Sequence, residues 1–342
     1  MINPDTKLVE NLFDSKIEQK PTRDGFGAGT IEVAKTGADV VVLCADLSES
    51  TRAEWFQKEF PERFVEMGIA EQNMAATAAG FALAGKIPYM ASYAAFSPGR
   101  NYEQIRTTIA LNQQHVIVCG MHAGVSVGAD GATHQMLEDI GLMRMLPNMT
   151  VIAPADAEEA RKAVVAAATH KGPIYIRFAR SATPVFTTPE TPFEIGKALM
   201  LWDSSTKGNS TANESAVKTP KVAILATGSM GYQALAAARA LETEGIGSIV
   251  LSVPTIKPLD SAAIIDAAKR TKRVITIEEH QAMGGFGSAV SELLSSEYPV
   301  PITRIGVQDV FGQSGSPEEL LAHYGLSSVH IVDAAHKLIT AY

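Results

Sequence analysis

Two histidines and an acid lie close together in the middle of the sequence, where they could handle protons. Asp130 and His134 belong to the segment GADGATHQ, residues 128–135, and His122 precedes that segment. A histidine can donate a hydrogen bond to a developing oxyanion or shuttle a proton, so the segment is typical of a site for a polyhydroxylated ligand. A structural role is the alternative, in which Asp130 and Thr133 cap a helix that begins near His134. The spacing leaves both open.

Glu71 is a second chemical candidate, in the segment EMGIAEQNM at residues 66–74. The small apolar residues that follow, AATAAGFALAG, predict a helix from residue 71 to residue 85. A carboxylate at the head of such a helix can simply be stabilised by the helix dipole. It can also be a buried group that takes part in chemistry, and the local sequence does not decide between these roles.

Short apolar strands that alternate with helices supply the framework for these residues. We predict strands at 40–47, 88–93, 115–120, 149–156 and 173–180. We predict helices at 71–85, 101–113, 133–146 and 156–170. This alternation predicts an α/β fold class with a mostly parallel sheet that is covered on both faces.

Polar and aromatic residues follow several of the predicted strands. Ligands of parallel α/β sheets bind at the carboxyl ends of the strands, so these residues are candidates for one site. They are Asp46, Ser50, Tyr93, Phe96, His122 and Arg180.

The alternation stops and then restarts, which predicts two doubly wound domains. We divide the chain into an N-terminal leader (1–20), a first domain (21–185), a linker or surface loop (186–219) and a smaller second domain (220–342). Residues 203–220 are rich in Ser, Thr, Asn and Lys, a composition typical of a loop. The glycines of MGGFGSAV, residues 283–290, lack the dinucleotide-binding spacing and predict a tight turn into a helix.

Composition excludes some classes of function. The chain has 342 residues and a formal net charge of −8, which argues against a general nucleic-acid-binding surface. It shows neither a signal peptide nor an apolar run of membrane-spanning length. Cys44 and Cys119 each lie in an apolar run, so we expect buried free thiols and a reducing, cytoplasmic location.

Several segments together resemble the transketolase family. EMGIAEQNM, ASYAAFSPGRNYEQIR, HAGVSVGADGATHQMLEDIGLMRMLPNM and IRFAR resemble the pyrimidine-binding domain of transketolase. ATGS, PTIKPLD and EEHQAMGGFGSAV, within residues 220–342, resemble the C-terminal domain of the same enzymes. Full-length transketolases also have a diphosphate-binding domain with a GDG motif and an Asn that holds Mg²⁺, and this sequence has no GDG. The resemblance therefore implies the C-terminal subunit of a split transketolase, whose partner supplies that domain in an α2β2 heterotetramer.

The resemblance also implies how the cofactor, thiamine diphosphate, is contacted. Glu71 matches the glutamate that hydrogen-bonds the N1′ atom of the aminopyrimidine ring. Phe96 and Tyr93 match the aromatic residues that stack on that ring. No metal ligand is expected in this chain, because the partner subunit would hold Mg²⁺ and most of the cofactor.

The substrate side follows from the same comparison. His122 and His134 match histidines that hydrogen-bond the donor sugar, and with Glu71 they are the expected catalytic residues. Asp130 matches the acid that contacts the C2 hydroxyl of aldose acceptors. The phosphate-binding positions are matched by Arg23, Ser50 and Arg180, since a guanidinium suits a phosphate.

The activity implied is the transfer of a two-carbon ketol unit from a ketose phosphate to an aldose phosphate. Three alternatives remain open from the sequence. The first is a 2-oxoacid dehydrogenase beta subunit, against which GADGATHQ argues. The second is a relative of deoxyxylulose-phosphate synthase, against which His122 argues. The third is a non-catalytic binding or regulatory module that kept the fold.

Overall fold

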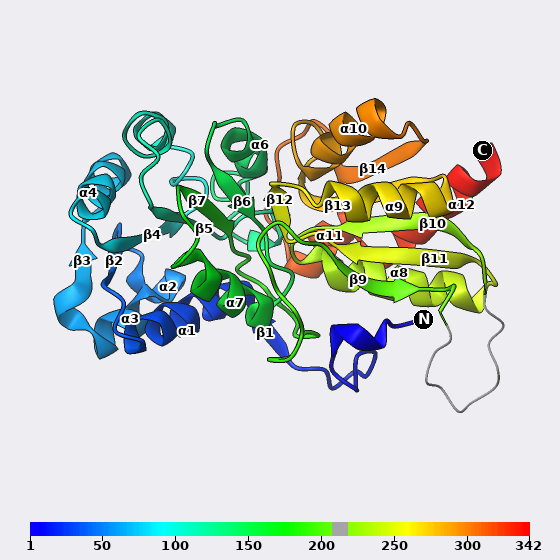
Figure 1. Cartoon of the computed structure of the whole chain (residues 1–342), viewed down its shortest axis with the longest axis horizontal. Coiled ribbons are helices and arrows are strands. Elements are labelled where there is room, and N and C mark those ends of the chain that lie inside the picture. The colour runs from blue at the N-terminus through cyan, green and yellow to red at the C-terminus, as the bar shows by residue number, and fades with distance from the viewer. Residues whose placement is uncertain (207–217) are drawn as a thin grey trace.

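Two α/β units lie side by side in the computed structural model of the chain, which describes residues 1–206 and 218–342 (Figure 1). The first unit is built on a seven-stranded sheet and the second on a five-stranded sheet. A separate antiparallel ribbon pairs β1 (Gln19–Pro21) with β8 (Ala182–Pro184) and so joins the two ends of the first unit. The predicted fold class, two doubly wound α/β domains, is confirmed.

The first sheet has the strand order β12, β6, β7, β5, β4, β2, β3. Its strands are β2 (Val40–Cys44), β3 (Phe64–Glu66), β4 (Ile87–Tyr93), β5 (Ile117–Met121), β6 (Thr150–Ile152), β7 (Ile174–Arg177) and β12 (Thr255–Lys257). All neighbours run parallel except β12, which pairs antiparallel with β6. Because β12 comes from the second half of the sequence, the second unit contributes a strand to the first sheet.

Helices cover both faces of this sheet because its strands are apolar on both sides. All five residues of β2, VVVLC, are buried, and successive side chains contact opposite faces. One face packs against α1 (Thr22–Lys35), α3 (Ala53–Glu59) and α7 (Ala157–Ala167). The other face packs against α4 (Glu71–Leu83), a π-helix (Ile105–Ala110) and α6 (Asp139–Arg144).

The second sheet has the order β14, β13, β10, β11, β9, and only β9 runs antiparallel to its neighbour. Its strands are β9 (Leu199–Asp203), β10 (Pro220–Ala226), β11 (Gly247–Ser252), β13 (Val274–Gln281) and β14 (Ile302–Val307). Its helices are α8 (Met230–Thr243), α9 (Ser261–Thr271), α10 (Phe286–Glu297), α11 (Pro317–His323) and α12 (Ser328–Ala341). One apolar core includes both Val118 of the first sheet and Leu225 of the second, so the two units pack through a continuous core.

The helix predicted for residues 133–146 is wrong over its first part. The segment GADGATHQ forms turns, and α6 begins only at Asp139. Gly128 and Gly131 have φ angles of 86° and 72°, a conformation that a right-handed helix does not use. Asp130 and Thr133 are therefore not helix caps.

The predicted linker also needs a correction. Leu199–Asp203 is strand β9, so this part of residues 186–219 belongs to the second sheet. The leader lies against it, since the Asn3 N–H donates to Leu201 O at 3.0 Å. Residues 207–217, the greater part of the predicted surface loop, lie outside the described residues, and the domain boundaries stay predictions.

Two smaller predictions are confirmed. Cys44 and Cys119 are buried free thiols, and burial raises the pKa of Cys44 to about 11. The glycine-rich segment at 283–290 turns at Gly284, where φ is 75°, and enters α10.

Among the helices of the described chain, none is both long and apolar enough to cross a bilayer.

Candidate active site

The carboxyl ends of the first sheet's strands bring the predicted site residues to one edge. Ser50 lies on α2 (Ser48–Thr51), which follows β2. Tyr93 is the last residue of β4, and His122 directly follows β5. Arg23 lies in the first turn of α1. This is the edge at which parallel α/β sheets bind ligands.

Four rings form the centre of this edge, and we call Tyr93, Phe96, His122 and His134 the ring cluster. The rings of Tyr93 and His122 stack with centroids 4.0 Å apart, and those of Tyr93 and Phe96 stack at 5.8 Å. His134 meets Phe96 edge-on at 5.5 Å and Tyr93 at 6.0 Å. Two strand ends and the GADGATHQ loop therefore meet in a cluster that presents aromatic surface beside imidazole nitrogens.

Arg23 ties the ring cluster to Ser50. Its Nη1 donates to the main-chain oxygen of Ser50 at 2.6 Å and to His122 Nε2 at 2.9 Å. The Tyr93 hydroxyl donates to Ser50 Oγ at 2.9 Å. Because a guanidinium can only donate, His122 Nε2 must accept, which places the imidazole proton on Nδ1.

His122 is held neutral. Burial, followed by the positive charges of Arg23 and Arg180, lowers the pKa of His122 to about 3. Its Nδ1 is buried and has no hydrogen-bond partner among the described residues. Its φ of 54° is a strained backbone conformation of the kind that gathers at functional sites. A neutral imidazole with an unengaged N–H is suited to donate a hydrogen bond to a ligand oxygen.

Glu71 is a buried group, not a surface group at a helix end. It is the first residue of α4 and only 3% exposed. In the described chain its Oε2 atom is buried without any hydrogen-bond partner. An unpaired buried polar atom costs about 1–3 kcal/mol, so a ligand that donates to it would recover free energy.

Asn101 links Glu71 to the ring cluster, and sequence reasoning missed it. Its Nδ2 donates to the main-chain oxygen of Glu71 at 3.0 Å and to Ser97 Oγ at 3.1 Å. Ser97 follows Phe96, so Asn101 holds the head of α4 against the loop that bears this ring. The available signal was a polar side chain just after the Ser-Pro-Gly turn that follows a strand.

The remaining two candidates lie at the rim. Arg180 is half-buried and its Nη1 donates to Val127 O at 2.8 Å. It is near enough to His122 to contribute to the low pKa of that imidazole. Asp130 is exposed, and within the described residues it has no hydrogen bond or ion pair with the ring cluster. The structure therefore brings eight of the nine predicted residues into one connected region and leaves Asp130 beside it.

In the described parts of the chain, 1–206 and 218–342, no three His, Cys, Asp or Glu side chains are grouped closely enough to hold a metal ion. The site instead offers hydrogen-bond donors, aromatic ring faces and the buried carboxylate of Glu71. This set suits a flat heteroaromatic ring and sugar oxygens better than it suits a cation.

Comparison with family models gives two matches along the chain. Residues 18–185 match the transketolase pyrimidine-binding domain, and residues 213–331 match the transketolase C-terminal domain. The chain belongs to the transketolase family. Membership implies thiamine diphosphate as the cofactor, and the two matches agree with the two α/β units of the structure.

Curated relatives show which part of a transketolase this chain resembles. A putative transketolase C-terminal section of Methanocaldococcus jannaschii is 42% identical over 91% of this chain and 94% of its own length. One of the subunits of an apulose-4-phosphate transketolase, from Phocaeicola vulgatus, is 36% identical over 93% of this chain and 97% of its own length. By contrast, the match to rat transketolase covers 49% of that protein. The transketolase this chain resembles is of the split kind, in which it corresponds to the C-terminal subunit.

Solved structures agree. A chain described as a split gene transketolase, an inactive beta4 tetramer, superimposes with a TM-score of 0.83 at 43% identity over 94% of this chain and 98% of that chain. Transketolase of Campylobacter jejuni superimposes with a TM-score of 0.75 at 24% identity over 96% of this chain and 50% of that chain, which shows the shared fold.

Proposed function

We propose that this chain, with a partner subunit that supplies a diphosphate-binding domain, transfers a two-carbon ketol unit from a ketose phosphate to an aldose phosphate. The observation on which the proposal rests is the ring cluster, linked through Asn101 to Glu71, whose Oε2 atom is buried and unpaired within the described residues. Relatives of the same extent are named transketolase subunits, which supports the same activity for this chain.

The residues present fit thiamine diphosphate. When bound, this cofactor supplies a carbon nucleophile that accepts the ketol unit. Glu71 Oε2 is a buried acceptor that lacks a donor, and it would hold the aminopyrimidine ring at N1′. Phe96 and Tyr93 would stack on the ring. Asn101 fixes the first residue of α4 relative to the loop that bears Phe96, and so would position both for these contacts.

The substrate contacts would come from the opposite part of the cluster. His122 donates from Nδ1 to the donor sugar's oxygen, because Arg23 occupies Nε2. His134 hydrogen-bonds the sugar hydroxyls from the GADGATHQ loop, and Asp130 contacts the acceptor at the rim. Arg23, Ser50 and Arg180 would bind the phosphate, because two guanidinium groups supply local positive charge in a chain whose net charge is −8.

The partner would carry the GDG motif and the Asn that holds Mg²⁺, and the complex would contain two copies of each subunit. A similar solved chain is an inactive beta4 tetramer, which supports a requirement for the second subunit. We propose a cytoplasmic location, which the two buried free cysteines support.

Reconstitution tests the proposed function. The chain is assayed alone and co-expressed with its genomic neighbour, with thiamine diphosphate, Mg²⁺, xylulose 5-phosphate and ribose 5-phosphate. We expect ketol transfer only in the mixture. Relatives are named for 6-deoxy-6-sulfo-D-fructose and apulose 4-phosphate, so both sugars are also tested. A folded complex that transfers a ketol unit from none of these sugars would contradict the proposal.

A further inference from the structure

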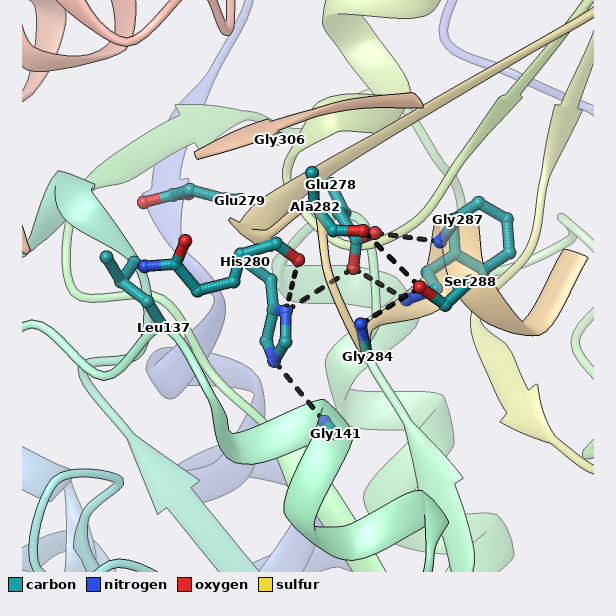
Figure 2. A network of polar contacts seen from close by, with 12 residues as sticks. Leu137, Gly141, Glu278, Glu279, His280, Ala282, Gly284, Gly287, Ser288 and Gly306 are labelled. Atoms are coloured by element: carbon teal, nitrogen blue, oxygen red, sulfur yellow. Dashed lines mark hydrogen bonds and ion pairs between the residues drawn. The ribbon is translucent and has the colours of Figure 1, made fainter. Parts of the chain in front are cut away.

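Two adjacent glutamates on β13, in the second unit, lie almost completely buried. Glu278 is 1% exposed and Glu279 is 2% exposed. Successive residues of a strand point to opposite faces, so the two carboxylates reach different surroundings. Figure 2 shows Glu278 extending toward Gly287 and Glu279 extending away from it.

Glu279 reaches across to the first unit. Its Oε1 accepts from the Ser126 N–H at 2.6 Å, and its Oε2 accepts from Ser229 Oγ at 3.0 Å. Ser126 lies in a 3-10 turn, Val125–Val127, between His122 and Asp130. A carboxylate of the C-terminal domain therefore fixes the main chain of the segment that joins two predicted substrate contacts.

Gly124 allows this approach. Its φ is 90°, and a Cβ added there would lie 2.2 Å from Glu279 Oε1. Only glycine fits that conformation and that space. We call residues 122–135, which carry His122, Asp130 and His134, the substrate segment. Its backbone at Gly124 leaves room for the Glu279 carboxylate, which argues that their contact is specific.

Neighbouring residues of β13 contact the chain that follows the GADGATHQ loop, at Leu137 and Gly141. The Gln281 N–H donates to Leu137 O at 2.9 Å. His280 Nε2 accepts from the Gly141 N–H at 3.3 Å, while its Nδ1 donates to Gln281 O at 2.7 Å (Figure 2). The second unit therefore holds the segment both before and after the GADGATHQ loop.

The loop is also held on its other side. Gln135 Nε2 donates to Val125 O and to Gln313 O, both at 3.0 Å. Gln313 belongs to the second unit, in the segment before α11. The loop that bears His134 is therefore supported at both ends and along its side by the C-terminal domain.

Glu278 provides an internal comparison. Its two oxygens accept from the Phe286 and Gly287 N–H groups at 2.6 and 2.7 Å, at the start of α10 in its own unit. Its Oε2 lies 3.7 Å from His280 Nδ1. The two adjacent carboxylates are about equally buried, but only Glu279 accepts a hydrogen bond from the chain between His122 and Asp130.

We propose that Glu279 is a positioning residue: from the C-terminal domain it fixes the segment that places His122, Asp130 and His134 for the sugar substrates. It acts through the Ser126 main chain. This role rests on the proposed function, and it gives the C-terminal domain a part in substrate binding although that domain supplies none of the ring cluster.

Shortening each glutamate by one methylene tests the role. Glu279→Asp keeps the charge but cannot span the distance to both partners, and Glu278→Asp makes the same change next to it. Loss of part of a charge-assisted hydrogen bond should raise the KM for both sugar phosphates about tenfold in Glu279→Asp. The affinity for thiamine diphosphate should stay unchanged, and kcat should change less than KM. Glu278→Asp should lower the melting temperature but leave KM as in wild type.

Hydrogen exchange of the backbone gives a readout that does not need activity. Exchange across residues 124–138 should rise in Glu279→Asp and stay as in wild type in Glu278→Asp. If the wild-type complex transfers no ketol unit, the proposed function fails, but this exchange still decides whether Glu279 fixes the segment. Equal effects of the two variants on KM or on exchange would overturn the positioning role.

Ser229→Ala covers the case in which Glu279→Asp does not fold. It removes only the hydroxyl that holds Glu279 Oε2. We expect a rise in KM of about threefold, smaller than in Glu279→Asp because the bond from the Ser126 N–H remains, with thiamine diphosphate affinity retained. An unchanged KM together with unchanged exchange at residues 124–138 would overturn the proposal.

Discussion

The carboxyl edges of the two sheets treat buried polar atoms in opposite ways. On β13, all four carboxylate oxygens of Glu278 and Glu279 accept a hydrogen bond. At the edge of the first sheet, Glu71 Oε2 and His122 Nδ1 are buried without a partner among the described residues. An unpaired buried polar atom costs about 1–3 kcal/mol, so the first edge holds a free-energy cost that a ligand can offset.

This difference separates a ligand site from a structural contact. The oxygens of Glu278 and Glu279 already accept from three main-chain N–H groups and the Ser229 hydroxyl, so these carboxylates fix segments of the chain. Unpaired donors and acceptors that face the same edge have capacity left. Two domains with related α/β architecture therefore have different roles: the first carries the unpaired polar groups, and the second fixes chain segments beside them.

Replacing Glu71 should give the largest effect. Glu71→Ala removes the acceptor for the cofactor ring, and we expect a loss of ketol transfer of about 10³-fold or more, as for a group that moves protons. The unfolding free energy should not fall, because the carboxylate oxygen has no partner to lose. Turnover of the reconstituted complex and denaturant unfolding of the chain are measured together.

Glu32→Ala is the control, because Glu32 is a half-exposed carboxylate that pairs with Arg161 on the surface of α1. It should retain full turnover. The contrast between unpaired and paired carboxylates would fail if Glu71→Ala also retained turnover. It would fail as well if the loss of turnover came with an unfolded chain.

Much of the fold could be predicted from the sequence because the first sheet is buried on both faces. Apolar runs such as the five residues of β2 mark such strands directly. The helix expected at residues 133–146 failed because two glycines with positive φ bend the chain before Asp139. Strand β9 was missed because a single antiparallel edge strand follows no helix and adjoins a polar segment.

The site was predictable where the chemistry follows a strand end. Ser50, Tyr93 and His122 all do, and parallel strands bring their ends to one edge. Glu279 was not predictable, since its contact with Ser126 joins residues 153 positions apart. Such a contact depends on how two domains pack, and no local pattern records it.

Breaking the buried ion pair between Arg177 and Asp139, which lies next to Glu279 of the second unit, should give the next largest effect. Arg177 Nε donates to Asp139 Oδ2 at 2.8 Å, and both side chains are buried. Arg177→Met leaves a buried carboxylate without its charge partner, so we expect a loss of about 3 kcal/mol of unfolding free energy. Denaturant unfolding measures it.

A surface pair calibrates that measurement. Lys86 and Asp39 are paired at 2.9 Å with side chains 35% and 57% exposed. Lys86→Met should change the unfolding free energy by less than about 1 kcal/mol. If Arg177→Met and Lys86→Met lowered the unfolding free energy by similar amounts, the buried Arg177–Asp139 pair would not be more stabilising than a surface pair.

The smallest effect concerns His122 and pH. Its pKa is about 3 in the folded chain, where burial, Arg23 and Arg180 oppose the charge, against about 6.5 in the unfolded chain. Between these values the unfolded chain binds a proton that the folded chain does not, so stability falls as pH falls below about 6.5. Between about pH 7 and pH 5.5 this group should remove about 1 kcal/mol of unfolding free energy.

His122→Asn should remove that dependence, and the comparison uses the change with pH, so a constant loss from the broken contact with Arg23 cancels. Arg23→Met should leave this dependence nearly as in wild type, because burial is the largest cause of the low pKa and a folded-state pKa well below about 5.5 keeps the imidazole neutral at both pH values. Denaturant unfolding of the three proteins at the two pH values gives the differences. An identical pH dependence in wild type and His122→Asn would mean that the edge of the first sheet does not hold this imidazole neutral.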